Sequence, residues 1–356
     1  MPRGVRFPRA ASASFVALCT LLAAGSGCAS CGQSFLGVIS GPINDPSNRS
    51  LRRDILSFGI KQFCPEMTQH SAPLKLQDDA PAIGRFYPKT CTQQTLENGD
   101  LFVQLSGVGY AYTNVSKKIS FQMSGTVQYD PDFLMDGSTM YAYFRTRQVQ
   151  GSNFTTRLIE QPVANLINQL TPLGDSFGKQ LVSGKLGEGF TVIRESSGNA
   201  DFGLGMIERG KRPVHPFDVK NTERTTYENM RVEVHQGERD FIGPIVITGA
   251  GHAIFVTANM DGAPAIDVLY LRKAEAEASL EYYLGYAQAG PLAGPPFMGD
   301  VIQAGAPYAR TVPVAEGTYW IVLDNTASAG QVAPPVNLLD DRAAVTNYVI
   351  QVGDAP

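Results

Sequence analysis

One short motif has the residues of a serine nucleophile. Residues 174–178, Gly-Asp-Ser-Phe-Gly, fit the G-x-S-x-G elbow, in which a serine sits on a sharp turn after a buried strand. Here Leu166, Leu170 and Leu173 recur at helical spacing, so a helix precedes the serine instead of a strand. We therefore interpret Ser176 as a residue on the polar face of a helix, and we expect no catalytic residues and no enzyme activity.

Two acidic stretches could supply oxygen ligands for calcium. Asp130, Asp132 and Asp136 form the first, which we expect to be a loop between two strands, and the second combines residues 324–325 with 340–341. Calcium takes six to eight oxygens, and the acids do not follow the EF-hand spacing. The histidines, at 70, 215, 235 and 252, are too scattered for a zinc site. We predict no metal and no cofactor, with calcium left open at both acidic stretches.

The first 27 residues have the pattern of a secretory signal. Arg3, Arg6 and Arg9 precede an apolar run at 15–24, which is followed by Gly25-Ser26-Gly27. The run is too short for a spanning helix, which needs about 20 residues. We expect residues 1–27 to be removed and the mature chain to leave the cytoplasm.

The stretch LLAAGSGCASCGQ, residues 21–33, resembles a bacterial lipoprotein signal. That family is cleaved just before a cysteine that carries a diacylglycerol, so the resemblance implies lipidation at Cys28 and a mature chain of 329 residues. It also implies a membrane-anchored protein of the cell envelope, on the periplasmic or surface face and most simply at the outer membrane. Gly25 stands where the family has an aliphatic residue. Cleavage before Cys31 and ordinary cleavage to a free chain stay open.

The remaining cysteines suggest one disulfide. An exported chain meets conditions in which disulfides persist. Cys64 and Cys91 both lie in the region expected to fold, whereas Cys31 lies in the tether at 28–46. We predict a Cys64–Cys91 bond. Cys31 is then unpaired, which is an argument for cleavage at Cys31 instead.

Hydrophobic periodicity predicts an α+β domain over residues 47–212. Residues 119–129 alternate apolar and polar side chains, and the segments 101–113 and 139–149 are rich in aromatic and β-branched residues. We predict an antiparallel β-meander from these three strands. Residues 158–182 then follow a helical period, so a long amphipathic helix should cover the sheet. Residues 65–99, with four prolines, are predicted to be irregular.

Aromatic side chains crowd the three predicted strands. If the helix lies over the sheet with a gap, the enclosed space would be apolar and could hold a lipid or another hydrophobic ligand. A filled core is the simpler interpretation, because large apolar residues are normally buried. The residues that would line such a space are Tyr110, Tyr112, Tyr129, Tyr141, Tyr143, Phe144, Leu166, Leu170 and Phe177.

The rest of the chain predicts a second, all-β domain. Residues 213–228 are charged and lack periodicity, so we interpret them as a linker. Short strands separated by Gly and Pro turns follow over 229–356, which is typical of a β-sandwich; LEYYLGY at 280–286 is one of the expected strands. The stretch GTYWIVLDNT at 317–326 resembles a strand of jelly-roll accessory domains in secreted bacterial proteins.

Composition limits the classes of function. Without its signal the chain has 26 basic and 33 acidic residues, a net charge of −7, and no basic cluster on which nucleic acid could release counterions. We predict a non-enzymatic envelope protein that binds or scaffolds an unknown envelope partner. The alternatives are a carrier of a hydrophobic ligand and a secreted hydrolase with a β-sandwich accessory domain.

Overall fold

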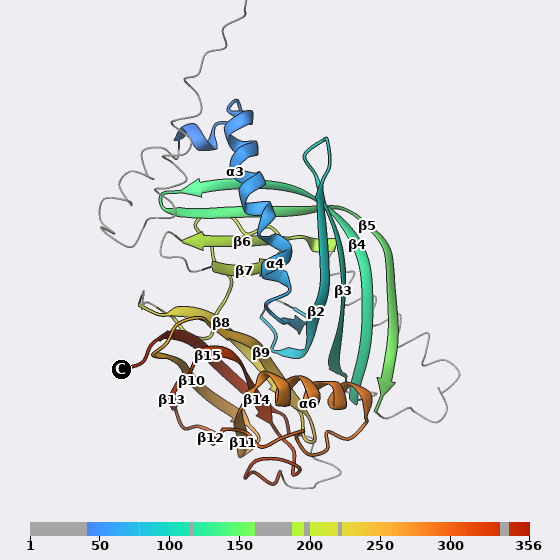
Figure 1. Cartoon of the computed structure of the whole chain (residues 1–356), viewed down its shortest axis with the longest axis vertical. Helices are drawn as coiled ribbons and strands as arrows, with labels where there is room; N and C mark the ends of the chain where they lie inside the picture. The colour runs from blue at the N-terminus through green and yellow to red at the C-terminus, as the bar shows by residue number, and fades with distance from the viewer. Residues whose placement is uncertain are drawn as a thin grey trace, which may run out of the picture.

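A computed structural model describes residues 41–77, 79–113, 117–160, 187–195, 200–219, 223–334 and 342–356. The described chain is mostly β, with two sheets and a few helices (Figure 1). No helix in these ranges is long and apolar enough to cross a membrane. The predicted signal and tether up to residue 40 lie outside them, as do Leu166, Leu170, Ser176 and Phe177.

The first sheet has the order β13-β10-β15-β8-β2-β3-β4-β5-β6-β7, with β1 paired to β2. We call residues up to 212 the first region and residues 213–356 the second region. The strands of this sheet that come from the first region are β1 Ala72–Lys75, β2 Ala82–Thr95, β3 Leu101–Thr113, β4 Lys117–Asp136, β5 Thr139–Ile159, β6 Phe190–Glu195 and β7 Ala200–Leu204. The four strands it draws from the second region are β8 Thr225–Val234, β10 His252–Gly262, β13 Tyr308–Pro313 and β15 Ala344–Asp354.

A second sheet covers that second region. Its order is β12-β11-β14-β9, formed by β9 Arg239–Ile247, β11 Ala265–Arg272, β12 Met298–Gln303 and β14 Gly317–Asp324. A buried core that includes Ile254, Val268, Tyr270, Ile321 and Ile350 fills the space between the two sheets. The predicted β-sandwich is therefore confirmed.

The first sheet runs through both predicted domains. Strand β8 begins inside the stretch predicted to be the linker, and it meets β2 in one parallel bridge between Ala82 and Val232. Figure 1 shows β8 beside the start of β2, so the two regions meet there.

Helices α3 Arg49–Lys61 and α4 Phe63–Met67 lie across one face of the meander (Figure 1). Phe63 packs against Tyr129, Phe144 and Phe190, with ring centroids 5.4–6.3 Å apart. A disulfide joins Cys64 of α4 to Cys91 of β2, which confirms the predicted pair. These contacts fix the helices on the sheet.

Three sequence predictions were wrong. Residues 65–99 contain β1 and β2, because a bulge after Pro88 lets the strand continue past a residue without an N–H. LEYYLGY belongs to helix α6 Lys273–Gly285, which buries Leu280, Tyr283 and Leu284 at helical spacing. The first acidic stretch was expected to be a loop, yet Asp130–Asp136 belongs to β4, which extends to a tight turn at Gly137.

The predicted helix at 158–182 begins too early. Leu158 and Ile159 pair with β4 as the last residues of β5. The rest of the segment lies outside the described residues from position 161 onward. Helix α6, instead, packs at the ends of β4 and β5 from the second region (Figure 1).

Candidate functional site

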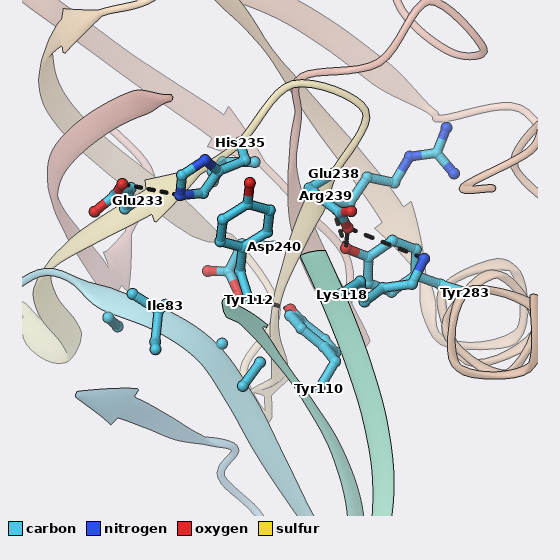
Figure 2. Close-up of a pocket in the computed structure, with 14 residues that line it drawn as sticks. Ile83, Tyr110, Tyr112, Lys118, Glu233, His235, Glu238, Arg239, Asp240 and Tyr283 are labelled. Carbon is cyan, nitrogen blue, oxygen red and sulfur yellow. Dashed lines mark hydrogen bonds and ion pairs between the residues drawn. The ribbon is translucent and has the colours of Figure 1, made fainter. Parts of the chain in front are cut away.

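A small polar cavity lies where the two regions meet (Figure 2). It leaves about 20 Å³ for the centres of water molecules, which suits a few waters and not a lipid. The walls come from β2, β3, β4, β8, β9, the β8–β9 turn and α6. The lining residues are Ala82, Ile83, Gly84, Tyr110, Ala111, Tyr112, Lys118, Glu233, Val234, His235, Glu238, Arg239, Asp240 and Tyr283.

Arg85 is the centre of a buried network beside this cavity, which we call the Arg85 cluster (Arg85, Glu228, Asp240 and Tyr348). Its side chain has no exposed surface and binds Asp240 through two hydrogen bonds of 3.0 and 2.8 Å. Two more, both 3.0 Å, go to Glu228, and a fifth reaches the Tyr348 hydroxyl. Bidentate pairing of this kind is the strongest that arginine makes.

The two carboxylates of this cluster determine the pKa of Arg85. Burial alone would lower the pKa of Arg85, but the carboxylates of Asp240 and Glu228 outweigh burial and hold that pKa well above its usual value. Arg85 comes from β2, whereas Glu228, Asp240 and Tyr348 come from β8, β9 and β15. One guanidinium thus joins the first region to three strands of the second.

Two tyrosines extend the network into the apolar junction. Tyr110 donates to Asp240 at 2.7 Å and accepts from the Phe241 amide at 2.9 Å. Tyr87 donates to the Phe241 carbonyl at 2.7 Å, and its ring packs on Trp320. Burial raises the pKa of both tyrosine hydroxyls well above the usual value.

A second network, the Glu238 cluster (Lys118, Glu160, Glu238 and Tyr283), lies across the cavity. The Tyr283 hydroxyl donates to Glu238, and the Lys118 ammonium lies 4.0 Å from the same carboxylate (Figure 2). That ammonium also donates to the Ala287 carbonyl at 3.1 Å and sits 3.9 Å from the centre of the Tyr283 ring. The lysine is 1% exposed, so its charge is held entirely by these partners.

The pKa values in this cluster move in the directions that burial dictates. Burial lowers the pKa of Lys118, against the opposing effect of the Glu238 and Glu160 carboxylates. Burial raises the pKa of Glu238 well above its usual value, helped by a hydrogen bond with Glu160 and opposed by Lys118. Clusters with such shifts mark candidate functional sites, although structural ion pairs produce them too.

Arg239 is among the residues that line the cavity, but its guanidinium points away from it (Figure 2). Its guanidinium binds Asp324 at 2.9 Å and donates to the carbonyls of Ala289 and Gly290 at 3.0 and 2.8 Å. Of the second predicted acidic stretch, Asp324 is therefore committed to this arginine, and residues 340–341 lie outside the described ranges. This group holds the loop after α6 against the sandwich.

His235 lines the cavity from the turn between β8 and β9. Its ring stacks on Tyr112 with centroids 3.4 Å apart and planes 10° apart (Figure 2). Its Nε2 atom lies 2.9 Å from a carboxylate oxygen of Glu233. Both rings are buried, so the stack fills this side of the junction.

The structure distributes the predicted ligand-lining residues over several places. Tyr110 and Tyr112 lie at the junction cavity, whereas Tyr129 and Phe144 pack with Phe63 under α4. Tyr141 and Tyr143 form a third group, in which the Tyr141 hydroxyl accepts from the Gly210 amide. The other three predicted residues lie outside the described ranges.

Each carboxylate of the first acidic stretch faces an arginine. Asp130 pairs with Arg147 at 2.9 Å and Asp136 with Arg209 at 2.7 Å. Asp132 binds Arg52 of α3 at 2.6 Å. Across the described ranges, no group of three or more histidine, cysteine or acidic side chains is placed to hold a metal ion.

Sequence reasoning missed the residues at the centre of the junction. Arg85, Lys118, Glu238 and Asp240 were not among the candidates. The available signal was weak: Arg85 stands between aromatic and apolar residues in the stretch GRFY, as an inward-facing charge in a strand would. Nothing local in the sequence identifies its distant partners.

Comparison with known proteins gives no relative. No protein-family description and no curated protein matches the chain. Among solved structures, one of the Bacillus endospore appendages that form disulfide-linked pili aligns with 40% of this chain and all of its own, at 9% identity and a TM-score of 0.22. An exo-β-1,3-galactanase from Phanerochaete chrysosporium aligns with 75% of this chain and 69% of its own, at 9% identity and a TM-score of 0.18. TM-scores this low carry no argument about fold or function.

Proposed function

We propose that this protein is an exported, lipid-anchored envelope protein with a non-enzymatic binding or scaffolding role. The observation that supports this role best is how the junction uses its charged groups. The Arg85 guanidinium donates hydrogen bonds to four side chains, those of Glu228, Asp240, Ser71 and Tyr348. Groups that bind one another so fully stabilise a shape, and a rigid shape is what a scaffold needs.

The disulfide supports the proposed location. Cys64 is buried, and its bond to Cys91 ties α4 to the sheet. Such bonds persist in exported proteins and are rare in the cytosol. Together with the signal pattern of residues 1–27, the bond favours an exported chain; the choice of Cys28 as the anchored residue rests on the resemblance of residues 21–33 to a lipoprotein signal.

Cell fractionation and intact mass test the anchor. We expect the full chain, expressed with its own N-terminus, to reach the membrane fraction with a mass that fits cleavage before Cys28 plus acyl chains. Cys28→Ser should abolish the acyl mass, and Cys31→Ser is the matched control that should leave it. A mature mass without acyl chains, or acylation that depends on Cys31, would refute anchoring at Cys28.

The carrier function is the second candidate. It rests on the finer fold prediction of an α+β domain in which a helix after β5, within residues 161–182, covers the meander. The jelly-roll form of the sandwich is a separate proposal and does not bear on the carrier function. Tyr110, Tyr129 and Phe144 already pack against protein side chains, which favours the scaffold. Native mass spectrometry separates the two: a scaffold should give the bare protein mass, and a carrier should retain a ligand that organic solvent extracts.

The hydrolase alternative has its own test. A fluorophosphonate probe labels activated serines, and Ser176→Ala is the matched control. We expect no labelling of either protein. Labelling that disappears in the alanine variant would replace the non-enzymatic proposal.

A further inference from the structure

Three chain segments bring two carboxyl groups together in the Glu238 cluster. Glu238 comes from the β8–β9 turn and is 5% exposed, and Glu160 follows the last residue of β5 within hydrogen-bond reach of it. One Glu160 carboxyl oxygen is shielded from solvent and receives no hydrogen bond from a conventional donor. Tyr283 of α6 completes the contact by donating to Glu238.

The charges of this cluster do not balance if both glutamates are ionised. Lys118 of β4 is the cation that faces them, with its ammonium 4.0 Å from Glu238. Arg239 of β9 is close but is bound to Asp324 at 2.9 Å. Two adjacent carboxylates in a poorly solvated place repel, and one of them then keeps a proton. With one proton between them, Lys118 neutralises the remaining charge.

We propose that Glu160 and Glu238 share one proton, and that this proton keeps the β8–β9 turn and α6 closed against the end of β5. The shared proton provides the missing partner for the buried Glu160 oxygen. Its loss would place two negative charges in contact at the point where the two regions meet. The junction is thus a pH-sensitive contact that loosens as the medium becomes alkaline.

The direction of the pH effect follows from linkage. Burial and the Glu160 hydrogen bond raise the pKa of Glu238 in the folded protein above the value in the unfolded chain. A carboxyl group shifted upward stabilises the fold fully below its unfolded pKa, and that contribution is lost as the pH rises through the folded pKa. Between the two values the unfolding constant rises by up to about tenfold per pH unit for one proton.

Lys118 acts in the opposite sense and must be separated from this effect. Its lowered pKa gives a contribution that is present above the unfolded pKa and is lost as the pH falls through the folded one. The other titratable groups that line the cavity are Glu233, His235, Tyr110, Tyr112 and Asp240. Comparison with variants that change only the carboxyl pair removes these shared contributions.

Two isosteric variants test the shared proton in the full chain. Glu238→Gln and Glu160→Gln each replace one carboxyl group by an amide that can donate permanently to the other. Urea unfolding, followed through Trp320 fluorescence at pH 5 to 9, should show stability falling with pH in the original protein and a much flatter dependence in both variants. Glu277→Gln on the exposed side of α6 is the control and should keep the original dependence.

Two direct measurements complete the test. In protein labelled with ¹³C at the glutamate carboxyl carbons, one signal should titrate well above the usual range and be absent from both variants. The hydrogen-exchange protection factors of residues 235–238, which are corrected for the base-catalysed intrinsic rate, should fall at alkaline pH in the original protein and stay constant in the variants. If the original protein and both variants share one pH dependence and no such signal exists, the proposal is wrong; if Glu238→Gln fails to fold, Glu160→Gln alone decides.

Discussion

Arg85 and Asp240 bind each other through two hydrogen bonds of 3.0 and 2.8 Å although 155 residues separate them in the chain. The same guanidinium binds Glu228 through two more, so one side chain faces two buried carboxylates. No other ion pair among the described residues joins the two regions with a fully buried arginine and two carboxylates. The contribution of this contact to the free energy of unfolding therefore depends on one residue, Arg85.

Replacing Arg85 should be severely destabilising. Arg85→Met leaves Glu228 and Asp240 buried without a cation, a change that costs about 3–5 kcal/mol of unfolding free energy. Urea unfolding can be followed by the fluorescence of Trp320, the single tryptophan. The control is Arg194→Met, which removes an exposed pair and should cost at most about 1 kcal/mol. Equal losses in the two variants would contradict the prediction.

The carboxylates themselves should account for most of that loss. Adding Glu228→Gln and Asp240→Asn to Arg85→Met removes the uncompensated charges, so we expect the triple variant to be more stable than the single one. The same urea experiment measures the difference. A triple variant no more stable than Arg85→Met would mean that lost packing, and not stranded charge, sets the cost.

Loss of the disulfide should destabilise the helix-covered face. The bond joins residues 27 positions apart, for which the loop-entropy account gives about 3 kcal/mol. The double variant Cys64→Ala with Cys91→Ala should lose about 2–4 kcal/mol of unfolding free energy. Reductant should lower the stability of the original protein similarly and leave the variant unchanged. An original protein that is insensitive to reductant would refute this.

Replacing either of two glycines by alanine should change the stability of the protein, but in opposite directions. A Cβ on Gly84 would lie 2.1 Å from the Tyr110 carbonyl oxygen, because β2 and β3 approach closely there. Gly84→Ala should therefore cost at least about 1–3 kcal/mol. Gly59 is exposed within α3 and meets nothing within 4 Å, so Gly59→Ala should add about 0.5–1 kcal/mol. Thermal melts report both signs, and a stabilising Gly84→Ala would show that the strands can separate.

The Tyr110 hydroxyl should matter beyond the ring that carries it. Tyr110→Phe keeps the packing but removes the donor to Asp240 and the acceptor for the Phe241 amide, at a cost of about 1–3 kcal/mol. Tyr282→Phe, on the exposed side of α6, is the control and should be neutral. If both variants unfold at the same urea concentration, the hydroxyl is not a structural part of the junction.

Local patterns in the sequence were enough for the long strands. The apolar and polar alternation of residues 119–129 continues through β4, and the aromatic stretch 101–113 coincides with β3. The strands of the sandwich could also be predicted, because glycine and proline turns separate them in the sequence. Cys64 and Cys91 could be paired because the other cysteines lay in the predicted signal and tether.

The errors arose where local signals compete. Pro88 argues against a strand, but a bulge absorbs it. Tyr282, Tyr283 and Leu284 favour a strand by residue type, yet the Ala- and Glu-rich residues before them and the burial of Leu280 and Leu284 favour a helix. Tertiary packing decided these cases.

The junction could not have been predicted from one sequence. Whether a buried arginine such as Arg85 is satisfied depends on Glu228, Asp240 and Tyr348, which lie 143 to 263 positions away. No spacing rule connects such distances. The same holds for Lys118 and Glu238, whose adjacency is created by the meeting of β4 with the β8–β9 turn.

The span of the Arg85 cluster sets the order in which the protein can mature. Arg85 is synthesised early, but Tyr348, to which it donates at 3.0 Å, follows 263 positions later. Contacts this distant form slowly, and the Arg85 guanidinium lacks its Tyr348 partner until β15 has been synthesised. Ribosome-bound or truncated chains that end before β15 will therefore be open at the junction and susceptible to proteases. Addition of β15 is the step that completes the Arg85 cluster.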